Sequence, residues 1–421
     1  MMSCAGNRHI STPNMDYIAQ NGARFTNAYC ANPVCLPSRF SMLTGFYPGQ
    51  FGLNDDAFDK NKFKVPEYIL SNGFGTLMKR RTYDAVYGGK VNLPSMTAAD
   101  LGFDYICADE RDKLARTCAE YILNHDEKPF FMVASFINPH DICLMAIADF
   151  ADEDPGVKNI MDSHAFEVEN VRNAARMPDR MNPEVFFNTV CPPLPVNYFP
   201  SADEPEAVCM LQEKRYFKKL VRERYTDRQW RLHRWAYAKL VESVDAQIGL
   251  IVDALIRSGQ WDDTVVMFTS DHGDMDASHK MEHKENLYEE CCRVPFIIKS
   301  VGGARGVTDG RLVVSGLDMI CTMMDYAGIE RPRYLKGESL RPFAENREGP
   351  YNRKHIVVEC ENGAMATDGR YKYVKYNEGE RAEQFYDLSV NPYERYNELD
   401  AAPPEKLEYL KTALENHFKY E

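Results

Sequence analysis

The feature that most constrains the fold is a set of short, continuously apolar runs separated by helical patterns. The clearest runs are residues 129–137, 264–270 and 294–299, and runs of this length without polar alternation are typical of strands buried on both faces. Apolar residues within 227–258 recur every three or four positions, which predicts a long helix. Strand, helix and strand in this order predict an α/β fold with a mainly parallel sheet sandwiched by helices.

The sequence pattern changes at two places along the chain. Several prolines and charge-rich stretches predict an irregular insertion, and towards the end short runs alternate like antiparallel strands before a closing helix. We therefore expect an α/β domain followed by a small α+β subdomain. The ranges are 1–340 for the first domain, 141–225 for its insertion, and 341–421 for the subdomain with strands at 355–359, 369–376 and 383–388 and a helix at 404–418.

Composition excludes several classes of protein. The 421 residues include 50 Lys and Arg against 63 Asp and Glu, a formal net charge of −13, and an acidic chain repels phosphate backbones, so we expect no nucleic-acid partner. No apolar run approaches 18 residues, so we expect no membrane span. The 12 cysteines are too sparse for a disulfide scaffold and are expected to be mostly reduced.

The most specific segment is residues 35–45, CLPSRFSMLTG. It fills every fixed position of the pattern C-x-P-S-R-x-x-x-L-T-G, and the preceding FTNAYC at 25–30 fits as well. A lone cysteine is usually a small buried apolar residue, but this match makes Cys35 a candidate for chemistry. The segment resembles the signature of type I sulfatases, members of the alkaline phosphatase-like superfamily.

That resemblance implies a sulfatase whose Cys35 is converted to formylglycine by a formylglycine-generating maturation enzyme. The hydrated aldehyde carries two hydroxyls on one carbon, so one can attack sulfur and expel the alcohol. The other can then collapse to the aldehyde and release sulfate, which makes this covalent catalysis with a built-in release step. Arg39 lies one helical turn further on and would hold the hydrate or a metal-ligand carboxylate.

A second constellation, SDHGDMDASHKMEHK at 270–284, follows one of the predicted strands. Ligands of α/β sheets bind at the carboxyl ends of strands, so its placement suits a site. It resembles the family's D-[NH]-G…K segment, which implies Asp271 and His272 as metal ligands beside Cys35, and Lys284 as a sulfate ligand. The implied metal is one Ca²⁺ ion, which prefers several oxygen ligands. The alternative is a solvated acidic loop.

Two histidines in this segment allow further readings. His279 is a candidate acid near the leaving oxygen, because family members of this type often carry a histidine there. His279 and His283 are four residues apart and would share one face of a helix, as zinc ligands do. The sequence HKMEH lacks the HExxH arrangement, however, which disfavours zinc.

Two more positions match the family. His140, in the segment NPH, follows the predicted strand at 129–137 and is the first choice of general acid; a histidine that satisfies a loop carbonyl is the alternative. Lys90, in YGGKVN, matches the lysine that bridges nucleophile and sulfate. Asn92 stands where the family has a histidine, and an amide cannot serve as a base. A phosphate-binding loop is disfavoured because GxxxxGK[ST] is not satisfied.

The largest departure from the family lies at the start of the chain. Family members open with a buried strand that ends in acidic metal ligands, and this sequence begins at the following segment. We expect a sheet short of an inner strand, with exposed ladder groups, and a metal site short of carboxylates. Asp55 and Asp56 are weak substitutes. A truncated sequence is the favoured explanation; no signal peptide is visible, so a periplasmic or cytoplasmic location stays open.

The leading hypothesis is hydrolysis of a sulfate ester on a sulfated small molecule or saccharide, with a weak preference for a carbohydrate. Trp230 and Trp235, close to the insertion, are candidates for lining a sugar pocket. One alternative is a phosphonate or phosphate ester hydrolase that uses the same aldehyde. The other is a truncated, non-catalytic sulfatase-like protein.

Overall fold

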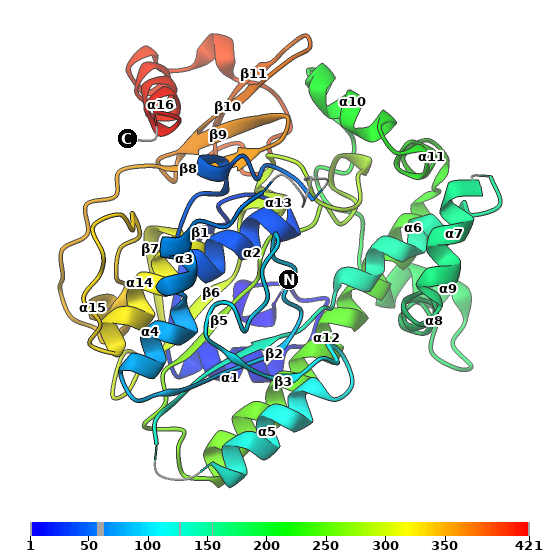
Figure 1. The fold of residues 1–421 in the computed structure, drawn as a ribbon. Coiled ribbons are helices and arrows are strands. Elements are labelled where there is room, and N and C mark those ends of the chain that lie inside the picture. The colour runs from blue at the N-terminus through cyan, green and yellow to red at the C-terminus, as the bar shows by residue number, and fades with distance from the viewer. Residues whose placement is uncertain (1, 57–62, 126–127, 154, 420–421) are drawn as a thin grey trace.

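The computed structural model describes residues 2–56, 63–125, 128–153 and 155–419. A central layer of strands lies between helices, and a second sheet with a covering helix lies at one end (Figure 1). The central strands are β1 (Ala23–Tyr29), β2 (Asp84–Gly89), β3 (Asp104–Cys107), β4 (Phe130–Ser135), β5 (Val266–Thr269), β6 (Phe296–Lys299) and β7 (Val307–Val314). The helices around them include α1 (Pro13–Gln20), α2 (Cys35–Thr44), α3 (Glu67–Ser71), α4 (Phe74–Arg80), α5 (Leu114–Asn124), α12 (Asp227–Arg257), α13 (Glu289–Cys292), α14 (Ser315–Tyr326) and α15 (Arg341–Ala344).

The central strands form two separate sheets. One has the order β3-β2-β4 and is parallel throughout, and the other has the order β5-β6-β1-β7. The predicted α/β class is confirmed, but β6 runs antiparallel to both β5 and β1, while β1 and β7 are parallel. The chain returns from β5 to β6 through a loop whose helical pieces are short, rather than through a crossover helix, so the direction reverses.

A large cleft separates the facing edges of β4 and β5. Its volume is about 1410 Å³, and apolar side chains of both strands and of α12 line it, among them Met132, Phe268 and Ile248. Every residue of β4 and β5 is only partly buried, whereas all of β6 is buried. In the part of the chain that the structure describes, no strand joins β4 to β5, so the central layer is interrupted inside the molecule.

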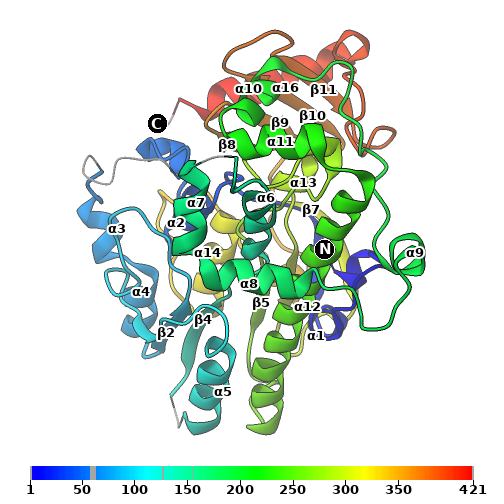
Figure 2. The same cartoon turned by 90° about the vertical axis from the view of Figure 1, so that its right-hand side faces the viewer.

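The long helix predicted at 227–258 is confirmed as α12. Thr226 caps it, because its hydroxyl accepts from the Gln229 backbone N–H while the Gln229 side chain accepts from the Thr226 N–H, a capping box. The lower half of α12 lies beside α5 (Figure 2). Its inner face forms one wall of the cleft.

The predicted irregular insertion at 141–225 is wrong in one respect, because the segment is largely helical. Its prolines fall at helix starts and in the connections, so each helix stays short. Trp230 is fully buried and Trp235 nearly so, both within apolar clusters, so they are core residues. The helices are α6 (Cys143–Asp149), α7 (Pro155–Ser163), α8 (Ala165–Ala174), α9 (Pro183–Val185), α10 (Glu206–Glu213) and α11 (Tyr216–Arg224).

The end of the chain forms an antiparallel sheet of order β11-β10-β9-β8, and α16 packs on it. The predicted strands and helix are confirmed, while β9 was missed because its sequence, GAMAT, shows no strand-like alternation. The bounds are β8 (Ile356–Cys360), β9 (Gly363–Thr367), β10 (Tyr371–Tyr376), β11 (Glu383–Asp387) and α16 (Pro404–His417).

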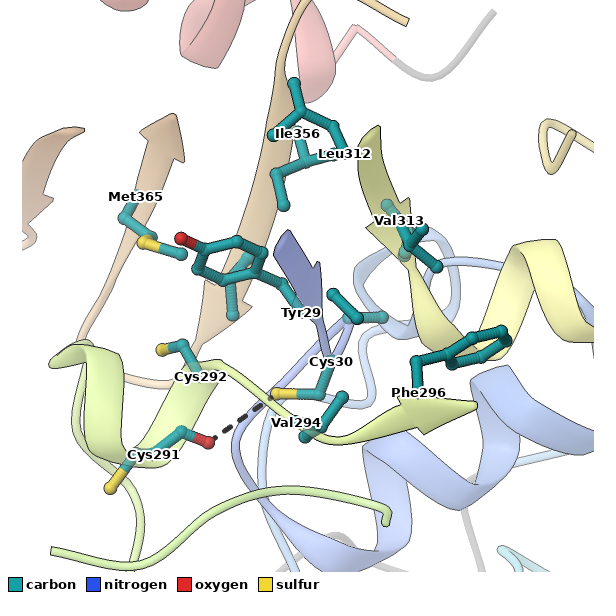
Figure 3. Close-up of a cluster of buried hydrophobic side chains, with 14 of the residues drawn as sticks. Tyr29, Cys30, Cys291, Cys292, Val294, Phe296, Leu312, Val313, Ile356 and Met365 are labelled. Carbon is teal, nitrogen blue, oxygen red and sulfur yellow. Dashed lines mark hydrogen bonds between the residues drawn. The ribbon is translucent and has the colours of Figure 1, made fainter. Parts of the chain in front are cut away.

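One apolar core crosses the predicted division at residue 340. Tyr29 and Val313 from the central strands pack in the same cluster as Ile356 and Met365 from the C-terminal sheet (Figure 3). The two parts therefore share buried surface, and their separation into domains stays a prediction. Within the described ranges, no helix combines the length and apolar character needed to cross a bilayer.

Candidate active site

Cys35 is the first residue of α2, and its side chain opens into the cleft. Its sulfur lies 3.1 Å from Nε2 of His272 and 3.8 Å from Nζ of Lys90. Burial alone would raise the pKa of the Cys35 thiol, but the positive charges of Lys284, His272 and Lys90 lower it to about 6. The helix start adds backbone N–H groups that favour a negative charge at this position.

Arg39, one turn along α2, joins the two central sheets. Its Nε donates to Oδ2 of Asp271 at 2.8 Å, just after β5, and its Nη1 donates to Oγ of Ser135 at 2.8 Å, at the end of β4. The same Nη1 donates to the carbonyl of Lys90 at 3.0 Å. Burial would raise the pKa of the Asp271 carboxyl, but Arg39 above all holds it far below its usual range.

Asp271, His272 and Cys35 are also the set of possible metal ligands found among the described residues. Their ligand atoms lie within 4.8 Å of one another. Ca²⁺ ordinarily takes six to eight oxygen ligands, and this set offers one carboxylate, one imidazole and one sulfur, with one oxygen of Asp271 already paired to Arg39. These three residues by themselves do not supply the oxygen ligands that a calcium ion requires.

The loop between His272 and α13 places the Lys284 side chain beside Cys35. Burial would lower the pKa of Lys284, but the neighbouring Cys35 sulfur raises it well above its usual value, so its ammonium stays charged. The loop folds back on itself through hydrogen bonds from Gly273 N–H to the carbonyl of Cys291 and from Met275 N–H to the carbonyl of His283, both 2.8 Å long. A Cβ at Gly273 would lie 1.9 Å from the Glu290 carbonyl oxygen, so glycine is required there.

His140 lies just beyond β4 and lines the same cleft as Cys35, Lys90 and Lys284. Burial, followed by the charges of Lys90 and Lys284, lowers the pKa of the His140 imidazole far below its usual value. The free protein therefore holds His140 neutral beside two ammonium groups. The buried carboxylate of Asp141, paired with Arg111 at 2.7 Å, fixes the loop on its other side.

Not every predicted residue joins this group. The His279 ring is fully buried, stacks on Tyr288 with centroids 4.3 Å apart, and lies 3.3 Å from Nδ2 of Asn197. Burial lowers the pKa of His279 to about 4. It does not line the cleft described here. No helix spans His279 to His283 in this described segment, so the shared helix face of the zinc reading is wrong.

Two other residues from the sequence analysis have local roles. Asp56 accepts a hydrogen bond of 2.8 Å from the Leu36 N–H, which satisfies a free donor at the start of α2. Asn92 is exposed and has a left-handed backbone, with φ of 46°. Neither belongs to the described metal-ligand set.

Sequence reasoning missed an ion pair between α11 and the loop that carries Lys284. Lys218 is buried and its Nζ lies 2.7 Å from Oε2 of Glu285, the residue after Lys284. These residues are far apart in sequence, and nothing in the local pattern around either of them indicates the pair.

Comparison with known proteins identifies the family. The family model described as Sulfatase matches residues 1–329, well over half of the chain. This chain belongs to the sulfatase family. A second model, described as N-sulphoglucosamine sulphohydrolase, C-terminal, matches residues 277–419 of the sulfatase and covers the C-terminal sheet.

Curated relatives support the same activity class. A Delta 4,5-hexuronate-2-O-sulfatase from Bacteroides thetaiotaomicron is 26% identical over 416 residues, covering 91% of this chain and 78% of the relative. An N-acetylglucosamine-6-O-sulfatase from the same organism is 25% identical over 446 residues, covering 95% and 76%. The sulfatase is accordingly an enzyme that hydrolyses sulfate esters. Members of its family generally use a formylglycine residue and a metal ion.

Solved structures confirm the fold. A 2-O GAG sulfatase superimposes with a TM-score of 0.79 at 23% identity, covering 100% of this chain and 88% of that one. The phosphonate monoester hydrolase of Agrobacterium radiobacter gives 0.73 at 19% identity, covering 100% and 93%. Both therefore share the overall fold of this chain.

Proposed function

We propose that this sulfatase removes sulfate from a sulfated saccharide, and that residue 35 acts as formylglycine after maturation of Cys35. The observation that carries the proposal is the convergence of Lys90, Lys284 and His140 on the Cys35 position within one cleft. The saccharide is supported by the relatives, since the two named above act on hexuronate and N-acetylglucosamine. When present, the formylglycine hydrate supplies the nucleophile and the means of releasing sulfate.

The residues of the chain prepare this position for an anion. Lys90 and Lys284 place two ammonium groups beside residue 35, so a sulfate ester that binds there has its negative charge neutralised on two sides. Arg39 is fully engaged by Asp271, Ser135 and a backbone carbonyl, so we assign it the task of holding the site together.

We assign His140 as the general acid that donates a proton to the leaving oxygen. Its imidazole is neutral in the free protein because of burial and the two lysines, and a bound sulfate ester brings the negative charge that offsets them and favours the protonated form. His279, buried against Tyr288 and Asn197, is proposed to keep the insertion against the loop.

His140→Ala tests this assignment. We expect kcat to fall about 10²–10⁴-fold for alkyl and sugar sulfates, whose alkoxides leave poorly without a proton, and little for 4-nitrophenyl sulfate. His279→Ala is the matched control and should lower both rates by the same factor. Equal losses on the two substrate classes in His140→Ala would exclude the donor role.

We propose that Asp271, His272 and residue 35 contribute to a divalent-cation site with weak affinity in this chain, about 10⁻³ M for Ca²⁺, as expected for a site with few charged ligands. Calorimetric titration with Ca²⁺ and Mg²⁺, with Asp271→Asn as the control, measures it. Tight binding that survives Asp271→Asn would contradict the assignment.

The maturation of Cys35 is directly measurable. Expression beside a formylglycine-generating enzyme, followed by mass spectrometry of the peptide that contains residues 30–45, should show the aldehyde at position 35. An unmodified thiol there would favour the non-catalytic alternative. Comparing kcat/KM for matched sulfate and phosphonate esters separates the remaining alternative, because lysine ligands around a tetrahedral anion do not themselves discriminate between the two.

A further inference from the structure

The loop that carries Lys284 is unusually strained. Asp276, Ala277, His279, Lys280, His283 and Glu285 all have left-handed backbones, with φ between 41° and 76°. Residues other than glycine seldom adopt this conformation, and it persists only where the surroundings enforce it. The loop must therefore be held by neighbouring elements in the shape that presents Lys284 to Cys35.

Helix α11, in the insertion, contacts this loop at several points. The Phe217 ring packs on the His283 ring with centroids 5.6 Å apart, and an Nη of Arg222 donates to the His279 carbonyl at 3.4 Å. Lys218 lies between Phe217 and Arg222 on the helix, and its Nζ is 2.7 Å from Oε2 of Glu285. One helix thus holds both flanks of Lys284.

Glu285 links this helix to the start of the catalytic helix. Its backbone N–H donates to the Pro33 carbonyl at 3.2 Å, just before Cys35. Its carboxylate is fixed by Lys218, which is 1% exposed, and by the more exposed Arg215 at 3.6 Å. Burial would raise the pKa of the Glu285 carboxyl, but Lys218 holds it at about 2, so the pair stays ionised.

We propose that Lys218 is a positioning residue for sulfate binding, which engages Glu285 and so keeps the Lys284 ammonium free to bind the anion. A buried lysine is costly unless a carboxylate pairs with it, and the carboxylate chosen here is the sequence neighbour of the sulfate ligand. Without Lys218, the Glu285 carboxylate keeps only the more exposed Arg215, at 3.6 Å, as an ion-pair partner. Its largely unneutralised charge, one residue from Lys284, then disfavours binding of the anionic sulfate. This proposal rests on the proposed function, because it presumes that Lys284 binds the sulfate group.

The test measures binding of inorganic sulfate, the product, to the full chain, with no turnover required. Lys218→Met should weaken sulfate binding about tenfold and raise KM for the ester similarly, with kcat less affected. Lys219→Met is the matched control: it is the next residue on α11, its side chain is 43% exposed, and it forms a surface pair with Glu213 at 3.6 Å. It should bind sulfate like the wild type.

The double variant Lys218→Met with Glu285→Gln separates positioning from a merely structural role. Removing both charges takes away the Glu285 charge that Lys218 neutralises, so sulfate affinity should return to within about threefold of wild type. Should Lys218→Met fail to fold, Glu285→Gln alone should bind sulfate at least as tightly as the wild type. Unchanged sulfate affinity in a folded Lys218→Met, or a double variant as weak as the single one, would overturn the proposal. If the wild type binds sulfate but hydrolyses no ester, the proposed function fails while this inference stands.

Discussion

The C-terminal sheet and the central layer of strands obey the same backbone rules but differ in completeness. In the C-terminal sheet β8 to β11 pair in sequence order without a break, and the core positions of β8 and β9 are all buried. In the central layer β4 and β5 face each other across a cleft of about 1410 Å³ and are only partly buried. The groups proposed to act in catalysis nevertheless line that cleft.

The difference shows what holds the site together. Hydrogen bonds of a continuous ladder align residues in the C-terminal sheet, whereas the central sheets are joined at the site by side chains. Arg39 contacts Asp271 after β5 and Ser135 at the end of β4, so one guanidinium spans the interruption. The site geometry consequently depends on a few charged contacts more than on strand pairing.

The largest effect is expected from removing that contact. Arg39→Met should lower the free energy of unfolding by about 3–5 kcal/mol, because it leaves the buried Asp271 carboxylate unpaired. Arg370→Met, which removes an exposed pair with Asp387 in the C-terminal sheet, should leave stability unchanged. Urea denaturation of both variants measures the two changes in unfolding free energy. Equal changes would mean that Arg39 does not join the sheets.

Truncating an aromatic side chain in each of the two regions should give the next largest effect on stability. Phe385→Ala, at a position 1% exposed in β11, should cost about 3–5 kcal/mol of unfolding free energy. Phe268→Ala in β5 should cost about 1 kcal/mol, since its partly buried ring faces the cleft and removing it creates little new cavity. A larger loss at Phe268 would contradict an open cleft between the strands.

Hydrogen exchange compares the C-terminal sheet with the central layer without any mutation. Backbone amides of β10, which is paired on both sides, should exchange at least about tenfold more slowly than those of β4. Within the described ranges, no strand pairs with the cleft edge of β4. The measurement is peptide-resolved exchange at neutral pH. Equal protection in the two strands would show that the cleft edge is covered.

The smallest expected signal comes from the unmodified thiol. The pKa of Cys35 is lowered to about 6, so its thiolate absorbance should appear with a midpoint near pH 6, well below that of an ordinary thiol. Because the folded pKa is depressed, the thiolate stabilises the fold above the ordinary pKa, and this contribution is lost as pH falls through 6. The Cys35→Ala variant is the blank, and a midpoint above 8 would contradict the electrostatics of the site.

Sequence could predict what short motifs and buried strands encode. Cys35, Asp271, His272, Lys90, His140 and Lys284 each sit in or beside a segment that follows a strand or begins a helix, and the fold brings all of them to one cleft. The direction of β6 could not be predicted, because a buried apolar run carries no sign of its partner's direction. The position of His279 depended on consecutive left-handed residues, and the Lys218 pair on packing between distant segments.

We propose that residue 35, in its modified form, carries out sulfate ester hydrolysis in this cleft. The most direct test compares the matured protein with Cys35→Ala on a sulfated disaccharide, with release of sulfate as the readout. We predict turnover by the matured protein and a loss of at least about 10³-fold in the variant. Hydrolysis that persists at the original rate without Cys35 would contradict the account.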